Sequence, residues 1–239
     1  MKNQFKVFLF AGFAAFLGLA APRAGAAPIL YGATGTGGGT GTLVTIDTAT
    51  GNYTVIGSLN DAQDTNYRIT GLAFHPTTGV LYGSIARSSF SVGSLVTIDP
   101  LTAAVTLVGS FGMGTQTMAD LTFSALGVLY GWLEPGDDDL YTIDLTTGAA
   151  TWVGESGLST YGAGLAATPG GPIYLAGSGA DGTLWTIDPG TGAATAGSSL
   201  NGGPSDGEGL PVPALAFSPG AAEIPEPSSL SLLVLGGLR

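Results

Sequence analysis

The pentapeptide LVTID occupies residues 43–47 and recurs unchanged at 95–99, and close variants follow as LYTID at 140–144 and LWTID at 184–188. Successive copies lie 52, 45 and 44 residues apart. This length is typical of one four-stranded blade of a β-propeller, whereas the repeats of β-solenoids are shorter. The spacing therefore favours a propeller with one blade for each copy.

Three more motifs recur in a fixed order around the pentapeptide. An apolar step such as Leu72-Ala73-Phe74 comes first, an LYG-like step such as Leu81-Tyr82-Gly83 second, and a segment such as YTVIG at 53–57 follows the pentapeptide as the fourth motif. Alternation and β-branched or aromatic residues predict a strand for each motif. We therefore expect an all-β fold with four strands in every blade.

The repeats also predict how the ring closes. The second motif comes first in the chain, at 30–32, and a copy of the first motif comes last, at 215–217. Pairing these terminal segments in one sheet completes a four-bladed β-propeller and removes an exposed edge. The first motif would then be innermost, where small residues such as Ala73, Ala166 and Ala216 suit the crowded axis. An eight-bladed ring made from two chains is the alternative.

The aspartate that ends each pentapeptide is explained by turn chemistry. The segments that follow are DTATG, DPLTA, DLTTG and DPGTG, in which a short carboxylate can accept backbone N–H bonds while glycine takes a positive φ. A ring of metal ligands is the alternative for four equally spaced acids, but the turn accounts for every copy. The structural turn residues are Asp47, Asp99, Asp144 and Asp188.

The phrasing of the repeats resembles β-propeller repeats of the NHL and PQQ-like kinds. LAFHPTTGVLYG at 72–83 is similar to the first hairpin of such a blade, and LYTIDLTTGAATWVG at 140–154 is similar to its second. The resemblance covers residues 28–220 and implies architecture only. Enzymes of these kinds use cofactor-stacking tryptophans or a central calcium with acidic ligands, and those sites do not match this chain residue by residue.

The amino-terminal segment predicts export. Lys2 and Lys6 precede the apolar run 7–21, and Ala24-Gly25-Ala26 supplies the small residues that a signal peptidase needs. An uncleaved anchor is the alternative, but the run is shorter than the roughly 20 residues of a spanning helix. We divide the chain into a signal peptide at 1–26, a β-propeller at 27–222 and a tail at 223–239.

The tail resembles the PEP-CTERM sorting signal of Gram-negative bacteria. Pro225-Glu226-Pro227 precedes the apolar run 230–238 and Arg239. The resemblance implies processing by an exosortase and delivery to the outer surface or the extracellular matrix, often amid exopolysaccharide, with transient anchoring by the tail. The run departs from the pattern because it is short and a single arginine replaces the basic cluster. A proline-rich linker is the alternative.

Composition excludes several classes of function. Once the signal is removed, three arginines remain against seventeen acidic residues, a net charge of −14. Such a surface repels nucleic acid and anionic lipid headgroups. The chain has no cysteine and one histidine, so disulfide frameworks, Cys–His catalysis and multi-histidine metal sites are excluded. The histidine, His75, stands at a turn, and the glycine-rich segment 35–41 lacks the lysine and helix of a phosphate loop.

Alternating strand direction places two sets of variable linkers on one face of the ring, where we expect any ligand to bind. The first set includes segments 84–94 and 132–139, and the second includes 58–69 and 156–163. Aromatic residues there would stack on a sugar or, as the favoured alternative, pack the loop bases. The ligand-binding candidates are Asp61, Asp64, Tyr67, Arg68, Trp132, Tyr161, Asp206 and Glu208.

Acidic residues on the same face suggest calcium, although a solvated acidic hairpin tip is the favoured alternative because the EF-hand spacing is missing. The candidate ligands are Glu134, Asp137, Asp138, Asp139 and Asp181. We expect no cofactor other than this calcium.

The sequence thus predicts an exported, non-enzymatic binding module at the cell surface or in an exopolysaccharide matrix. Signal peptidase and an exosortase would process it, and a polysaccharide or a surface protein would be its partner. A calcium-dependent, lactonase-like hydrolase and a purely structural matrix component are the alternatives. Paired carboxylates for glycoside cleavage stay open, because their separation is spatial.

Overall fold

The computed structural model describes residues 28–34, 40–85, 93–114, 116–134, 136, 138–160, 163–168, 171–176, 183–199 and 214–217. Among these residues there are sixteen strands and no helix, and the strands form four antiparallel four-stranded sheets. In order from the inner to the outer strand, blade one contains β16 (Ala214–Phe217), β1 (Leu30–Ala33), β2 (Thr42–Ile46) and β3 (Tyr53–Ser58). Blade two contains β4 (Ile69–Phe74), β5 (Leu81–Ile85), β6 (Ser94–Ile98) and β7 (Val105–Ser110).

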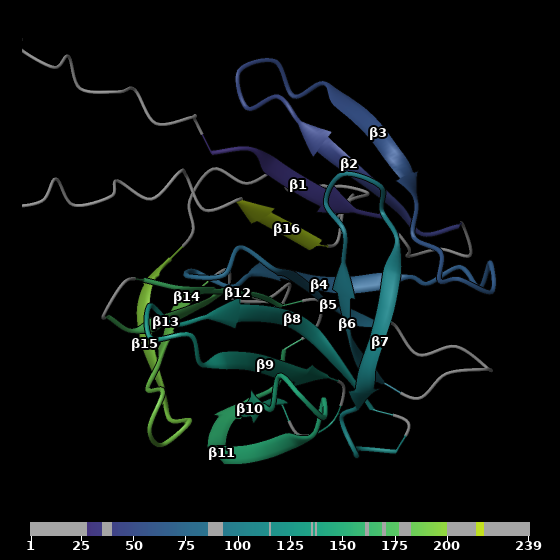
Figure 1. Ribbon diagram of the computed structural model, residues 1–239. Helices are drawn as coiled ribbons and strands as arrows, with labels where there is room; N and C mark the ends of the chain where they lie inside the picture. The colour runs from purple at the N-terminus through teal and green to yellow at the C-terminus, as the bar shows by residue number, and fades with distance from the viewer. Residues whose placement is uncertain are drawn as a thin grey trace, which may run out of the picture.

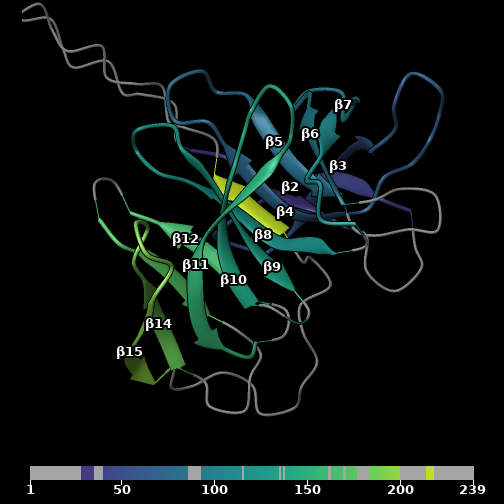
Figure 2. The ribbon, with the colours of Figure 1, turned by 90° about the horizontal axis from the view of Figure 1, so that it is seen from below.

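The other two blades repeat this order. Blade three contains β8 (Thr117–Phe123), β9 (Leu129–Glu134), β10 (Asp138–Ile143) and β11 (Ala150–Leu158). Blade four contains β12 (Gly164–Ala167), β13 (Ile173–Ala176), β14 (Thr183–Ile187) and β15 (Ala194–Ser199). The four sheets form a ring, so the predicted four-bladed β-propeller is confirmed (Figures 1 and 2).

The innermost strands are those of the first sequence motif, as predicted. β16 lies against β4, β4 against β8, and β8 against β12, while β3, β7, β11 and β15 are the outer strands (Figure 2). At the junction of the two chain ends, β1 pairs antiparallel with β16, with Tyr31 opposite Ala216 and Gly32 opposite Leu215. The predicted closure by terminal strands is therefore confirmed. The Tyr31 ring also packs edge-on against Phe74 of blade two, with 5.3 Å between ring centroids.

The hydrophobic core lies between neighbouring blades. Three clusters of buried side chains join blade one to two, two to three, and three to four. The first residue of the pentapeptide is fully buried in Leu43, Leu95 and Leu140. Burying one such side chain contributes roughly 1.5–3 kcal/mol, which accounts for the recurrence of leucine at the start of the motif.

Each pentapeptide ends in the same aspartate-led turn. Asp47 Oδ1 accepts the N–H groups of Ala49 at 2.8 Å and Thr50 at 3.1 Å, and Asp99, Asp144 and Asp188 accept equivalent bonds. In blade three the hydroxyls of both threonines at 146 and 147 also donate, and these bonds lower the pKa of Asp144 to about 2. The turns close with a positive φ at Gly51, Gly148 and Gly192 and at Ala103 in the second copy.

The outer strands contact the turn of the next blade through glycine. A Cβ added at Gly57 would lie 3.0 Å from the carbonyl oxygen of Thr102, and one added at Gly154 would lie 1.8 Å from that of Thr191. Gly109 approaches Thr147 in the same way, at 2.0 Å. Glycine is required where two backbones come this close. These contacts fix the spacing of consecutive blades.

Candidate functional site

Blade three departs from the other blades at the two residues before the pentapeptide. Blades one, two and four have a glycine followed by a hydroxyl residue there, as in Gly41-Thr42 and Gly93-Ser94, whereas blade three has Asp138-Asp139. The glycines have a packing role, since an added Cβ would lie 1.7 Å from Tyr67 O at Gly41 and 2.4 Å from Gln116 O at Gly93. Asp138 therefore replaces a residue whose repeat position requires close backbone packing.

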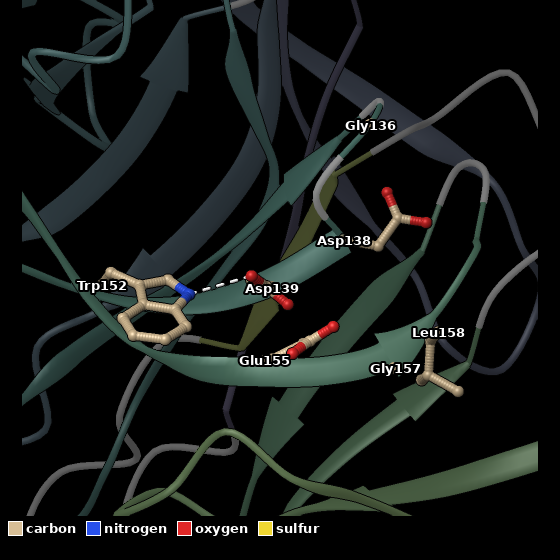
Figure 3. A pocket seen from close by; sticks show the side chains of 7 residues that line it. All are labelled: Gly136, Asp138, Asp139, Trp152, Glu155, Gly157 and Leu158. Carbon is tan, nitrogen blue, oxygen red and sulfur yellow. Dashed lines mark hydrogen bonds between the residues drawn. The ribbon is translucent and has the colours of Figure 1, made fainter.

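The carboxylates accept hydrogen bonds from β11 and from the segment that follows it. Asp139 Oδ1 accepts the N–H of Ser156 and its Oδ2 accepts the indole Nε1–H of Trp152, both at 2.9 Å (Figure 3). The N–H of Thr160 donates to Asp138 Oδ2, and the hydroxyl of Ser156 donates to the backbone oxygen of Asp138. Asp138 is 4% exposed and Asp139 is 9% exposed. Two buried carboxylates are thus held mainly by backbone and side-chain donors of one neighbouring segment.

One oxygen of this pair has no partner. Asp138 Oδ1 is buried and accepts no hydrogen bond from the residues that the structure describes. An unsatisfied buried acceptor costs about 1–3 kcal/mol, and more when the group is charged. A buried carboxylate oxygen without a donor is therefore the group in this region that would gain most from a bound ligand.

Irregular pairing opens a cavity beside these residues. β11 has nine residues, against six in each of β3, β7 and β15. Asp138 is opposite Leu158 but Leu140 is opposite Gly154, so the outer strand bulges between them. Beside the bulge lies a half-open cavity of about 220 Å³, lined by Gly136, Asp138, Asp139, Trp152, Glu155, Gly157 and Leu158 (Figure 3). The strands also reach into segments expected as loops, since β9 continues to Glu134 and β11 to Leu158.

Trp132 and Glu134, both proposed as site residues, lie inside the blade. Trp132 is fully buried and its Nε1–H donates to Thr160 Oγ1 at 3.1 Å, so it offers no stacking face to a ligand. Trp132 therefore packs the base of the loop, which was the favoured alternative to stacking on a sugar. Glu134 is 7% exposed and its Oε1 accepts Thr160 Oγ1–H at 2.9 Å and the N–H of Ala163 at 3.1 Å. Neither side chain lines the cavity.

Two of the candidates in segment 58–68, Asp61 and Tyr67, bond to each other within their own loop. Asp61 Oδ1 accepts the N–H groups of Gln63 and Thr65, and its Oδ2 accepts the Tyr67 hydroxyl at 2.7 Å. The Tyr67 hydroxyl is the largest of the influences that lower the pKa of Asp61. Asp64 has a positive φ of 60°. These residues and Arg68 are not among those lining the cavity.

The remaining candidates lie outside the described residues. They are Asp137, Tyr161, Asp181, Asp206, Glu208, Pro225, Glu226 and Pro227, together with the segments 1–26 and 223–239. Within the described part of the chain, no three acidic or histidine side chains are grouped so that they could hold a metal ion. Calcium at this rim stays a prediction. In the same part, no helix is long and apolar enough to cross a membrane.

A second departure in blade three, at Asp120, was not predicted. Its equivalents in the inner strands of the other blades are Gly71, Gly164 and Ala214. The Asp120 carboxylate accepts the N–H of Leu165 in blade four and that of Leu121, each at 2.8 Å. Desolvation between the inner strands raises the pKa of Asp120 to about 8 despite these bonds. The alignment of the repeats did contain a signal for Asp120, because it is the single acid at a position where the other blades have glycine or alanine.

His75 is used in the turn between β4 and β5. Its Nδ1 accepts the N–H groups of Thr77 and Thr78, both at 3.2 Å, and its ring packs against Phe123 with centroids 5.0 Å apart. This is the turn role expected for the histidine. The β4–β5 turn that contains His75 lies on the same side of the ring as the β10–β11 turn. The cavity is at the other end of β10 and β11, beside Asp138 and Leu158, so His75 lies on the opposite face.

Comparison with known proteins places the fold but no family. No family model matches the chain, and no curated protein matches it. Among solved structures, a chain of a nidogen/laminin complex is similar with a TM-score of 0.50 and 15% identity over 73% of this chain and 62% of that one. A puromycin hydrolase (TM-score 0.46, 17% identity, 72% and 29% coverage) and TolB from Acinetobacter baumannii (0.42, 16%, 66% and 37%) are also similar. The chain spans less than two thirds of each of these proteins.

Proposed function

We propose that this chain is an exported, non-enzymatic β-propeller that binds a partner at the cell surface or in the extracellular matrix. The observation that carries the binding role is the acidic cavity of blade three. It arises where Asp138 and Asp139 replace the glycine and hydroxyl residue of the other blades, on a scaffold that otherwise repeats. Rigid repeats that present one irregular rim are a common basis for recognition.

The destination is supported by the two ends of the sequence. The leader-like segment 1–26 and the Pro225-Glu226-Pro227 tail each suggest export, and they do so independently. A non-enzymatic role is supported by the chemistry near the cavity. The one histidine, His75, belongs to a turn on the other face, and Asp139 already accepts two donors, from Ser156 and Trp152.

Fractionation of cells that produce the chain tests the destination. We expect the mature protein in the outer-surface or matrix fraction, and replacement of Pro225-Glu226-Pro227 by alanines should retain it in the envelope. Recovery of both forms in the cytoplasm would rule out the proposed destination.

Binding of the purified full chain to arrayed surface glycans and to surface proteins of the same cells tests the role. We expect saturable binding. The binding should be reduced when Asp138 is replaced by glycine and Asp139 by serine, the two residues that blade two has at 93 and 94. Absence of binding to every glycan and protein would favour a structural spacer, and turnover of lactone or glycoside substrates would favour an enzyme.

A further inference from the structure

We propose that the Asp120 side chain is a pH-sensitive latch that holds blade four against blade three and releases it when the carboxyl group loses its proton. The inference concerns a motion of the scaffold, so it goes beyond the proposed binding function and does not depend on it. Its basis is the contact between the inner strands β8 and β12, which lie side by side in the ring (Figures 1 and 2).

Two side chains of β8 form hydrogen bonds with the backbone of β12. Asp120 Oδ2 accepts the N–H of Leu165 at 2.8 Å, and Thr122 Oγ1 accepts the N–H of Ala167 at 2.9 Å. β12 is the inner edge strand of its sheet, so these bonds join one blade to the next. Blade four is thus bonded to blade three through one ionisable acceptor and one neutral acceptor.

The junction of blades two and three is bonded through a neutral group. There the hydroxyl of Thr70 donates to the backbone oxygen of Met118 at 2.7 Å. Gly71 also lets the two inner strands approach closely, because an added Cβ would lie 2.7 Å from the Asp120 Cα. A change of pH leaves the charge of the Thr70 hydroxyl unchanged, whereas it changes the charge of the acceptor that faces blade four.

Burial disfavours the ionised form of Asp120. Desolvation is the largest influence on its pKa and raises it to about 8, while the N–H groups of Leu165, Leu121 and Leu72 lower it by less. All of these donors are backbone groups. The ionised carboxylate is therefore stabilised by dipoles alone at a place that water reaches poorly.

Neighbouring charges do not offset this cost. On the strands packed against β8, the titratable side chains are Tyr82, Tyr130 and Glu134. Each of them is neutral or acidic, so none supplies a positive charge. Arg68, the one arginine or lysine among the described residues, precedes β4 and is not among the influences on the pKa of Asp120.

Ionisation therefore weakens the contact between the two blades. An aspartate in water has a pKa of about 3.9, so a carboxyl released from the contact gives up its proton more readily than one held between the strands. The closed contact is most stable below about pH 4 and loses stability as the pH rises to about 8. Asp120 is half-buried and the neighbouring Gly164 is exposed, so the proton can reach solvent without unfolding of the propeller.

Blade four is the blade that ionisation would release. In its pentapeptide Leu184 is half-buried, whereas the equivalent Leu95 and Leu140 are fully buried. Among the described clusters of buried side chains, blade four belongs to one and blade two belongs to two. Segments with fewer buried apolar contacts open at a lower free energy. Opening of β12 from β8 therefore needs less free energy than opening of β4 from β8.

Hydrogen exchange of the full mature chain, measured by mass spectrometry between pH 5 and pH 8, tests the latch. Each exchange rate is compared with that of the unfolded chain at the same pH, which gives the protection due to structure. We expect β12 and β14 to be protected at least tenfold less than β5 and β6, because blade four opens before the whole chain unfolds. The protection of β12 and β14 should fall by up to about tenfold per pH unit, the limit for one proton. Equal protection of blades two and four, or protection of blade four that is constant with pH, would overturn the proposal.

Variants assign the effect to one side chain. Asp120→Asn keeps an acceptor for the N–H of Leu165 but does not titrate, so the protection of blade four should become independent of pH. Thr122→Val is the matched control, since it removes the neutral bond of the same contact. It should lower the protection of blade four by a similar factor at every pH and leave the pH dependence in place. A pH dependence that persists in Asp120→Asn would overturn the proposal.

A second replacement covers the case in which Asp120→Asn does not fold. Asp120→Ala introduces at this position the residue that blade one has at Ala214, and it also removes the titrating group. Its blade four should exchange at a protection that does not vary between pH 5 and pH 8. The same dependence on pH as in the unmodified chain would assign the effect to another group and overturn the latch.

Discussion

Blade one and blade three both depart from the repeat, but in different respects. Blade one draws its inner strand, β16, from the other end of the described chain, while the two residues before its pentapeptide, Gly41-Thr42, follow the common pattern. Blade three is continuous in sequence, yet it carries acids at Asp120, Asp138 and Asp139 where the other blades carry small or hydroxyl residues. Ring closure and unusual chemistry therefore belong to different blades and should be separable by mutation.

The largest effect is expected from removing the closing strand. Deleting residues 212–239 exposes the paired edge of β1 and removes the neighbour of β4, which leaves blade one with three strands. A loss comparable with the whole stability of a domain, about 5–15 kcal/mol, would abolish cooperative melting. Circular dichroism melts should show this, with a chain that ends after Phe217 as the control. Equal melting temperatures for the two truncations would contradict closure by β16.

The second-largest effect on stability is expected from Asp120, whose equivalent in blade one is Ala214. An unfolded aspartate has a pKa of about 3.9, and in the folded chain the pKa of Asp120 is raised to about 8. The folded state therefore keeps a proton that the unfolded state releases, and stability falls as the pH rises from about 4 to about 8. The slope is of the order of 1 kcal/mol per pH unit, with an upper limit of about 1.4.

Chemical denaturation at several pH values between 5 and 8 measures this slope. Asp120→Asn should flatten it because the amide does not titrate. Asp61→Asn is the control, since the pKa of Asp61 is lowered and that carboxylate titrates below this range. A wild-type stability that is constant from pH 5 to 8 would contradict the assignment.

The smallest effect compares equivalent glycines of blades one and three. An alanine Cβ at Gly154 would lie 1.8 Å from the Thr191 oxygen, but at Gly57 it would lie 3.0 Å from the Thr102 oxygen. We expect Gly154→Ala to cost about 1–3 kcal/mol, as overpacking does, and Gly57→Ala to cost less than Gly154→Ala. Denaturant midpoints check the order, and a reversed order would show that the spacing of blades three and four is not set at this contact.

The architecture could be predicted because the repeat records it directly. A leucine that starts each pentapeptide is buried in three blades, and an aspartate that ends it bonds to its own turn, so local sequence suffices. The closing pair of strands followed from the order of the motifs. These features depend on neighbours that are close in sequence or on a period that is visible by eye.

The site depends on register, which the sequence shows less clearly. Register shifts on both sides of Leu140 set which β11 residues meet Asp139, and another shift, between Met118 and Asp120, sets how the inner strand presents its acid. Trp132 was expected in the linker 132–139 because it follows the second motif, but β9 continues past it and buries it. One extra residue on one strand changes the face of every side chain after it.

The pairing of β1 with β16 also sets an order of events during synthesis. The partner of residues 30–33 is residues 214–217, so the first blade has no inner strand until nearly the whole propeller has been translated. Until then the early blades hold an open end, and contacts of such long sequence separation form slowly. A chain built in this way completes its ring late, which would suit the export proposed for it, in which a chain crosses a membrane before it folds.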